Sequence, residues 1–123
     1  MKPCSLVVLE KDARIARALV LSLHRHVQSI SVTNSCTALH DEIAKRRAQL
    51  AVVDLEQACL EEINKLHHEY PQLAIVCTHR LADDGMWLEA LRAGASDLCG
   101  ARDLRSIVCS VLDQMQPSQI AAA

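Results

Sequence analysis

The feature that most constrains the fold is an alternation, repeated five times along the 123 residues, between a short apolar run and a longer amphipathic stretch. The short runs are typical of strands, and the longer stretches place apolar residues at helical spacing. The predicted strands lie at residues 6–9, 29–33, 50–53, 73–77 and 98–99, and the predicted helices at about 13–26, 36–47, 60–70, 83–93 and 104–112. Five such units predict an α/β fold with a parallel sheet, helices on both faces and right-handed crossovers.

The character of the strands predicts their order in the sheet. The first, third and fourth are continuous apolar runs, which suit burial on both faces. The second alternates apolar and polar residues and the fifth is very short, as edge strands can be. The flavodoxin-like order 2-1-3-4-5 puts those two strands at the edges. We therefore expect one doubly wound domain over residues 1–115, followed by a tail or the start of a linker at 116–123.

Composition argues against several function classes. Thirteen Lys and Arg against fifteen Asp and Glu give a net charge of −2, so the chain has no basic surplus for nucleic-acid or membrane phosphates. Trp87 and Tyr70 are the whole aromatic content, which leaves little for stacking on bases. No apolar run approaches the ~20 residues of a membrane span, and the first residues do not resemble a signal peptide. We expect a cytoplasmic protein that binds neither nucleic acid nor membrane directly.

Six cysteines and six histidines raise the question of a metal or redox site. No C-x-x-C pair is present and most cysteines lie in apolar runs, where Cys behaves as a small buried hydrophobe, so we expect reduced thiols that are buried or incidental and have no metal or redox role. His24 with His26, and His67 with His68, have spacings that do not share a helical face, which indicates surface histidines. His79 follows the fourth strand, where it either donates to an anion or has the gating or packing role that we favour.

Three polar residues are predicted to meet at one edge of the sheet. In folds of this order, ligands bind at the carboxyl ends of the strands, near the first and third. Glu10 follows the first strand, Asp54 ends the third and Thr78 ends the fourth. An aspartate there can attack a phosphoryl group when a divalent cation and a fixed positive charge neutralise the incoming oxygens. The alternative is that Asp54 and Thr78 only cap helices or satisfy loop amides.

Residues 90–97 read A-L-R-A-G-A-S-D. This segment is similar to the A-L-x-A-G-A-x-D segment of the receiver domain of two-component response regulators, and the resemblance extends over residues 6–112. It implies that Asp54 stands at the phospho-accepting position and Thr78 at the family's hydroxyl position. It also implies that Glu10 is the second residue of the acidic pair that helps to bind magnesium.

The sequence departs from the family at the charges that phosphoryl transfer uses. Leu9 stands at the first acidic position, and Ala101 stands where the family has the lysine that pairs with the phosphoryl group. Glu10 and Asp54 remain as carboxylates for a weakened Mg²⁺ site, since magnesium prefers several hard oxygen ligands. Leu98 replaces the switch aromatic of the fifth strand, and the loop after Asp54 lacks the family's Pro and Gly. The resemblance therefore implies a degenerate pocket, poorly suited to standard phosphorylation.

The function that we expect is that of a pseudo-receiver: a regulatory module, not an enzyme, that binds a protein partner. In the family, the surface of the fourth helix, fifth strand and fifth helix commonly pairs with a second receiver, giving a homodimer, or with an output domain. Here that surface carries Trp87, Leu91, Arg92, Leu98, Asp103 and Arg105. The alternative is a working phosphorelay receiver whose Asp54 accepts a phosphoryl group from a histidine kinase or phosphotransfer protein to control an output such as transcription. A flavin or nucleotide enzyme finds little support, because no glycine-rich loop follows the first strand.

Overall fold

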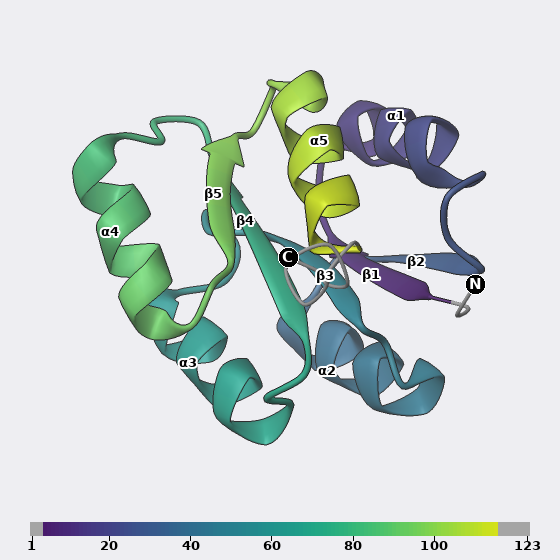
Figure 1. The fold of residues 1–123 in the computed structure, drawn as a ribbon, viewed down its shortest axis with the longest axis horizontal. Coiled ribbons are helices and arrows are strands. Elements are labelled where there is room, and N and C mark those ends of the chain that lie inside the picture. Colours follow the sequence, from purple (N-terminus) through teal and green to yellow (C-terminus); the bar gives the residue numbers. More distant parts are fainter. Residues whose placement is uncertain (1–3, 116–123) are drawn as a thin grey trace, which may run out of the picture.

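The computed structural model describes residues 4–115, which form one five-stranded sheet and five helices (Figure 1). The strands are β1 (Ser5–Leu9), β2 (Ser29–Thr33), β3 (Leu50–Asp54), β4 (Ala74–His79) and β5 (Asp97–Gly100). The helices are α1 (Ala13–Leu23), α2 (Cys36–Arg46), α3 (Leu60–Glu69), α4 (Asp84–Ala93) and α5 (Leu104–Gln114). All strand pairs are parallel and the order is β2-β1-β3-β4-β5, which confirms the predicted flavodoxin-like α/β fold.

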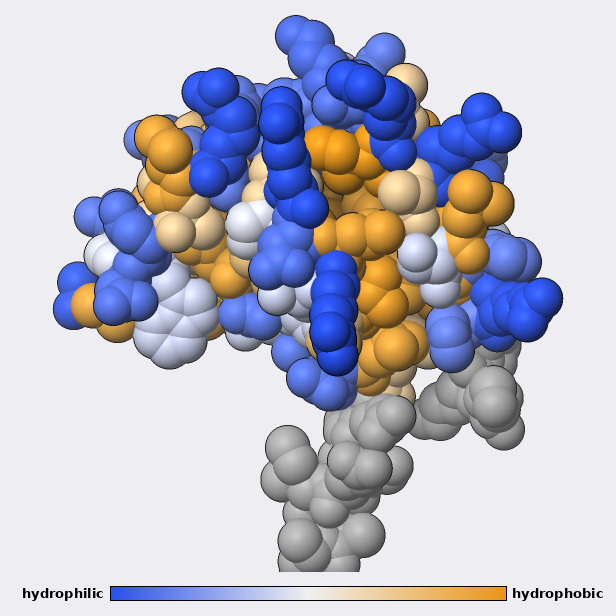
Figure 2. All heavy atoms as spheres, turned by 90° about the horizontal axis from the view of Figure 1, so that it is seen from above, coloured by the Kyte–Doolittle hydropathy of each residue, from blue (hydrophilic) through white to orange (hydrophobic). Residues whose placement is uncertain are grey.

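The helices cover both faces of the sheet (Figure 1). On one face, Leu19 of α1 and Ile107 of α5 join the core formed by Val8 and the valines beside it. On the other face, α2, α3 and α4 cover a second core that includes Leu39 and Ile63. Each such side chain contributes ~1.5–3 kcal/mol when fully buried. The polar faces of the helices point outward, so that hydrophilic side chains surround an apolar strip in the view from above (Figure 2).

The two predicted edge strands are confirmed as edges. Every residue of β3, in the middle of the sheet, is buried. In β2 only Thr33 is buried, and Val32 is 45 % exposed. β5 has four residues and pairs with β4 on one side, so its other side is the open edge of the sheet.

The predicted end of the first helix is wrong. It was expected near residue 26, whereas α1 ends at Leu23. The His24 N–H closes the last helical turn on the Val20 carbonyl, and the His26 N–H then donates to the Leu23 carbonyl in a tighter turn. This turn lets the chain reverse direction before β2, which the apolar spacing alone does not reveal.

The fourth strand extends further than predicted. It runs from Ala74 to His79 because β5 pairs with its last residues, in the register Thr78 with Cys99 and His79 with Gly100. Within the described residues, no helix has the length and apolar character needed to cross a membrane. The tail predicted at 116–123 lies outside the described residues.

All six cysteines are free: two are buried, two are half-buried and two are exposed. Burial raises the pKa of Cys77 to about 12 and that of Cys99 to about 11, so both behave as the predicted buried hydrophobes. Cys59 and Cys109 are exposed, because they lie at the start of α3 and on the outer side of α5. The four histidines predicted to lie at the surface are exposed, as expected: His24, His26, His67 and His68.

Candidate functional site

Three polar side chains lie in one row at the carboxyl end of the sheet, as the sequence predicted. Asp54 and Thr78 are register partners on β3 and β4, and Glu10 follows the last residue of β1. Side chains two residues apart on a strand share a face. Two positions before them lie the core residues Val8, Val52 and Val76, which pair across the sheet and pack under α1 and α5. The three polar side chains are therefore on the same face of the sheet as this core.

The row is almost closed to solvent. Glu10 is 7 % exposed, Asp54 6 % and Thr78 1 %. Burial raises the pKa of Glu10, and the negative charge of Asp54 adds to the rise. The Oε2 atom of Glu10 accepts the Asp12 N–H at 3.1 Å, which partly offsets the cost of burying the charge. Two acidic groups are thus held near each other in a poorly solvated place, and the negative charge of Asp54 disfavours the ionised form of Glu10.

The carboxylate of Asp54 holds the loop that follows β3. Its Oδ1 accepts the backbone N–H of Glu56 at 3.0 Å, and its Oδ2 accepts the side-chain amide of Gln57 at 3.2 Å. Its backbone carbonyl accepts the N–H groups of Gln57 and Ala58, both at 3.0 Å. Each side-chain oxygen therefore accepts one hydrogen bond from the loop, in the way that the alternative interpretation of Asp54 as a ligand for loop amides predicted.

Thr78 supplies a buried hydroxyl to the row. Its backbone carbonyl accepts the Leu55 N–H at 2.8 Å. Its hydroxyl, although buried, has no hydrogen-bond partner among residues 4–115. An unpaired buried hydroxyl is costly, about 1–3 kcal/mol, and such groups are rare in folded proteins. This hydroxyl is therefore able to bond an additional atom.

The positions of the two missing charges are occupied by small or apolar side chains. Leu9 is fully buried and belongs to the core under α2, α3 and α4, on the face opposite to Val8. Ala101 is 6 % exposed, and its N–H donates to the His79 carbonyl at 3.0 Å. Neither residue brings a charge to the row.

His79 does not fill the place of the missing lysine. Its Nδ1 accepts the Leu81 N–H at 3.0 Å, which fixes the ring against its own loop. The ring lines a cavity of about 450 Å³ with Leu55, Cys59 and Met86, between the start of α3 and α4. This arrangement is the packing position that we favoured from the sequence.

The residues at the row do not make a good magnesium site. Magnesium prefers near-octahedral coordination by hard oxygens. Glu10 and Asp54 offer two carboxylates, but three of their four oxygens already accept the hydrogen bonds described above. No group of three or more acidic, histidine or cysteine side chains suited to a metal gathers within the described part of the chain.

Of the residues predicted to form an interaction surface, Leu98 is buried and the others are exposed or half-buried. Trp87 is 43 % exposed, Arg92 and Arg105 are exposed and Leu91 is half-buried. Leu98 is only 8 % exposed, because its side chain joins the core on the α4 side of the sheet. Asp103 is the N-cap of α5, where its two oxygens accept the N–H and the hydroxyl of Ser106. Leu98 is therefore the one residue of this predicted set that is not at the surface, whereas Asp103 is exposed.

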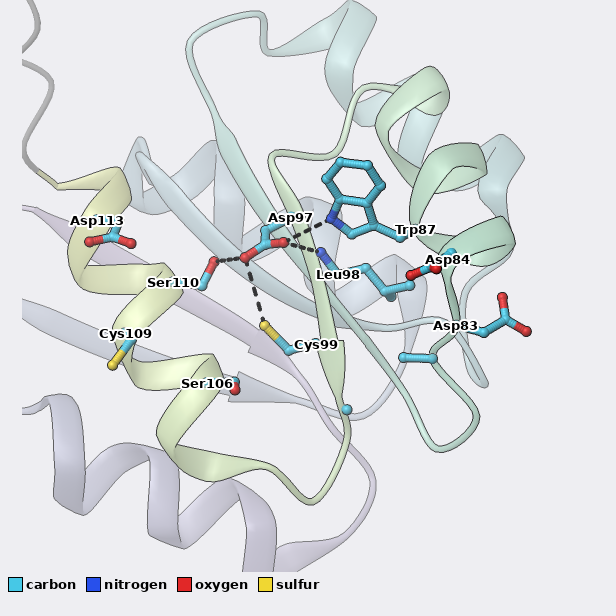
Figure 3. A pocket seen from close by; sticks show the side chains of 12 residues that line it. Asp83, Asp84, Trp87, Asp97, Leu98, Cys99, Ser106, Cys109, Ser110 and Asp113 are labelled. Atoms are coloured by element: carbon cyan, nitrogen blue, oxygen red, sulfur yellow. Dashed lines mark hydrogen bonds between the residues drawn. The ribbon is translucent and has the colours of Figure 1, made fainter.

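Asp97 is a structural centre of this surface that the sequence analysis did not single out. Its Oδ1 accepts the Trp87 indole N–H at 3.2 Å and the Leu98 N–H at 2.8 Å. Its Oδ2 accepts the Ser110 hydroxyl at 2.6 Å and lies 3.9 Å from the Cys99 Sγ. One carboxylate thereby links α4, β5 and α5 (Figure 3). Its position as the last residue of the A-L-R-A-G-A-S-D segment was the available signal.

The comparison with solved structures finds receiver domains. A response regulator from Thermotoga maritima superposes with a TM-score of 0.84 at 14% identity, over 93% of this chain and 98% of that one. The orphan response regulator HP1043 of H. pylori gives 0.82 at 14% identity, over 92% and 97%. The chain therefore has the fold of response-regulator receiver domains.

A third structural relative has an unusual mode of regulation. It is an atypical orphan response regulator with a phosphorylation-independent regulatory mechanism, and it superposes with a TM-score of 0.81 at 14% identity, over 92% of this chain and 96% of that one. No protein-family model matches the sequence, and no curated protein matches it either.

Proposed function

We propose that this chain, which has the receiver-domain fold, is a degenerate receiver that signals by binding a protein partner, without a phosphoryl cycle on Asp54 and without catalysis of its own. The observation that carries the proposal is the state of the Asp54 carboxylate. Both of its oxygens accept hydrogen bonds from Glu56 and Gln57, while Leu9 and Ala101 bring no charge to the row.

The chemistry of phosphoryl transfer supports the proposal. A phosphoryl group carries negative charge on its oxygens, and its transfer depends on cations placed where that charge develops. A phosphoryl group on Asp54 would lie close to the acidic side chain of Glu10, in a place where burial already disfavours negative charge. Without a lysine at residue 101, the charges of the row oppose both the transfer and its product.

The partner is a protein, and the surface formed by α4, β5 and α5 is where we propose that it binds. Half of the Trp87 side chain is exposed there, together with Arg92 and Arg105. The partner is an output domain, a second copy of the chain, or a histidine kinase or phosphotransfer protein. The phosphorylation-independent mechanism of the atypical orphan regulator is a precedent for such a module on this fold. We expect the module to act in the cytoplasm.

The proposal is tested with fluoroberyllate, a mimic of the phosphoryl group that binds an unoccupied phosphoryl site through a cation. Fluorine NMR of the protein with fluoroberyllate and magnesium is expected to show only the free species, and the Asp54→Asn variant is expected to give the same spectrum. A bound signal that requires magnesium and disappears in Asp54→Asn would contradict the proposal. An intact receiver with all its charges serves as the positive control.

A second function is favoured by one observation, the unpaired hydroxyl of Thr78. A phosphoryl group on Asp54 would lie beside this hydroxyl, which has a hydrogen to donate. In this alternative, Gln57 releases Asp54 and the aspartate accepts the group from a histidine kinase. The fluoroberyllate experiment separates the two functions, since only the alternative predicts a signal that is lost in the Thr78→Val variant.

A further inference from the structure

A cavity of about 620 Å³ opens along the free edge of the sheet, between α4 and α5 (Figure 3). We call it the β5 cleft. All four residues of β5 line it, α4 and the loop before it form one wall with Trp87, and α5 forms the other with Ser110. The cleft is separate from the row of Glu10, Asp54 and Thr78, none of which lines it.

Trp87 is held in a fixed position in the cleft. Its indole N–H donates to Asp97, which also accepts the Ser110 hydroxyl from the opposite wall. The side chain nevertheless remains 43 % exposed. A tryptophan that is fixed at its polar end and exposed over its ring offers a prepared surface for a flat or cationic group, because little side-chain freedom is lost on binding.

The cleft carries negative charge that no ion pair within residues 4–115 neutralises. The Asp97 carboxylate is fully used, but Asp83, Asp84 and Asp113 line the cleft with exposed side chains. Asp83 uses one oxygen to accept the Met86 N–H and keeps the other. None of the ion pairs among residues 4–115 involves these three aspartates, and none of the lining residues is Lys or Arg.

We propose that the β5 cleft binds a cationic segment of a partner protein, with an arginine of that segment stacked on Trp87 and paired with the aspartates of the walls. This inference rests on the proposed function and specifies the partner's chemistry. A guanidinium stacks well on an indole face and bonds carboxylates with two parallel N–H groups. Carboxylates on both walls repel a phosphate backbone, so the charge of the cleft favours a basic protein segment over a nucleic acid.

The probe for the test is a fluorescein-labelled tetra-arginine peptide, with tetra-citrulline as its uncharged control of nearly the same shape. Polarisation at low ionic strength is expected to show binding of the arginine peptide alone. The variant Asp84→Asn with Asp113→Asn and the variant Trp87→Leu are each expected to weaken binding at least about fivefold. The matched control, Asp41→Asn with Glu69→Gln, removes two exposed negative charges from α2 and α3 and is expected to leave binding unchanged.

Three results would overturn the inference. One is no binding by the folded parent protein, and another is an equal loss in the cleft variant and the control variant, which would show a response to net charge alone. The third is a dimer of the parent protein in sedimentation that is lost in the cleft variant but persists when the peptide is added. That result would show that a second copy of the chain occupies the cleft. The fluoroberyllate spectrum is independent of the cleft. Failure of peptide binding with no fluoroberyllate signal therefore rejects the cleft alone, whereas a fluoroberyllate signal rejects the proposed function.

Discussion

The Asp54 carboxylate accepts the backbone N–H of Glu56 at 3.0 Å, so the aspartate at the predicted phospho-accepting position closes the loop behind its own strand. The second oxygen is used by Gln57 in the same loop. Each of the two carboxylate oxygens thus spends one of its acceptor sites on the loop. The relationship gives Asp54 a role in stability that does not depend on phosphorylation.

The first prediction separates the effect of the Asp54 hydrogen bonds on stability from the effect of its negative charge. Asp54→Asn keeps an acceptor oxygen for the Glu56 N–H and removes the repulsion with Glu10, so the melting temperature in the presence of chelator is expected to stay the same or rise. Asp54→Ala removes both loop bonds and is expected to lower the free energy of unfolding by about 1–3 kcal/mol. Thermal melts of the two variants make the comparison. A similar large loss in both would show that the negative charge itself stabilises the fold.

The second prediction concerns pH and Glu10. Burial raises the pKa of Glu10 in the folded protein above that of an ordinary glutamate. Glu10 therefore contributes most to stability at a pH below the ordinary pKa of a glutamate. This contribution is lost as the pH rises through the raised pKa of the folded protein. The Glu10→Gln variant cannot ionise and keeps an acceptor for the Asp12 N–H. Its melting temperature is therefore expected to exceed that of the parent at neutral pH, with a difference that shrinks on acidification. The exposed Glu89→Gln serves as control, and a difference that does not vary with pH would contradict the assignment.

The third prediction concerns the link between α4 and α5. Asp97→Ala leaves the Trp87 indole and the buried Ser110 hydroxyl without their shared acceptor, and is expected to cost about 2–4 kcal/mol in urea unfolding. Ser110→Ala removes one donor and is expected to cost about 1 kcal/mol. Because Trp87 is the single tryptophan, its emission reports the change directly, with a shift to the red in Asp97→Ala. An unchanged emission in a folded Asp97→Ala variant would show that the indole is positioned by other contacts.

The fold could be predicted because the residue patterns of its strands and helices are local and recur along the sequence. Apolar runs of strand length and helices with one apolar face recur five times, and burial on both faces distinguishes β3 from the edge strand β2. The end of α1 could not be predicted, since the chain leaves the helix at Leu23 through a turn that depends on where β2 begins. The spacing of apolar residues indicates which face of a helix is buried. It does not indicate where the chain must turn back toward the next strand.

The site could be predicted only in part, for a similar reason. Glu10, Asp54 and Thr78 meet because the strand ends of a parallel sheet lie side by side. The partners of Asp54 were not predicted, because a turn of two or three residues decides them. Asp97 gathers donors from α4, β5 and α5, and contacts between separate elements leave no periodic signal in a sequence.

The most direct test of the central claim is intact mass after incubation with acetyl phosphate and magnesium, applied to the parent and to the double variant Leu9→Asp with Ala101→Lys. The parent is expected to keep its mass. The double variant, which adds a carboxylate beside Glu10 at the end of β1 and a lysine after β5, is expected to gain one phosphoryl group that a further Asp54→Asn change abolishes. Since Leu9 is fully buried, the variant is expected to lose about 2–5 kcal/mol, and its circular dichroism must first confirm that it is folded. Rapid gain of one phosphoryl group by the parent, lost in Asp54→Asn, would contradict the account.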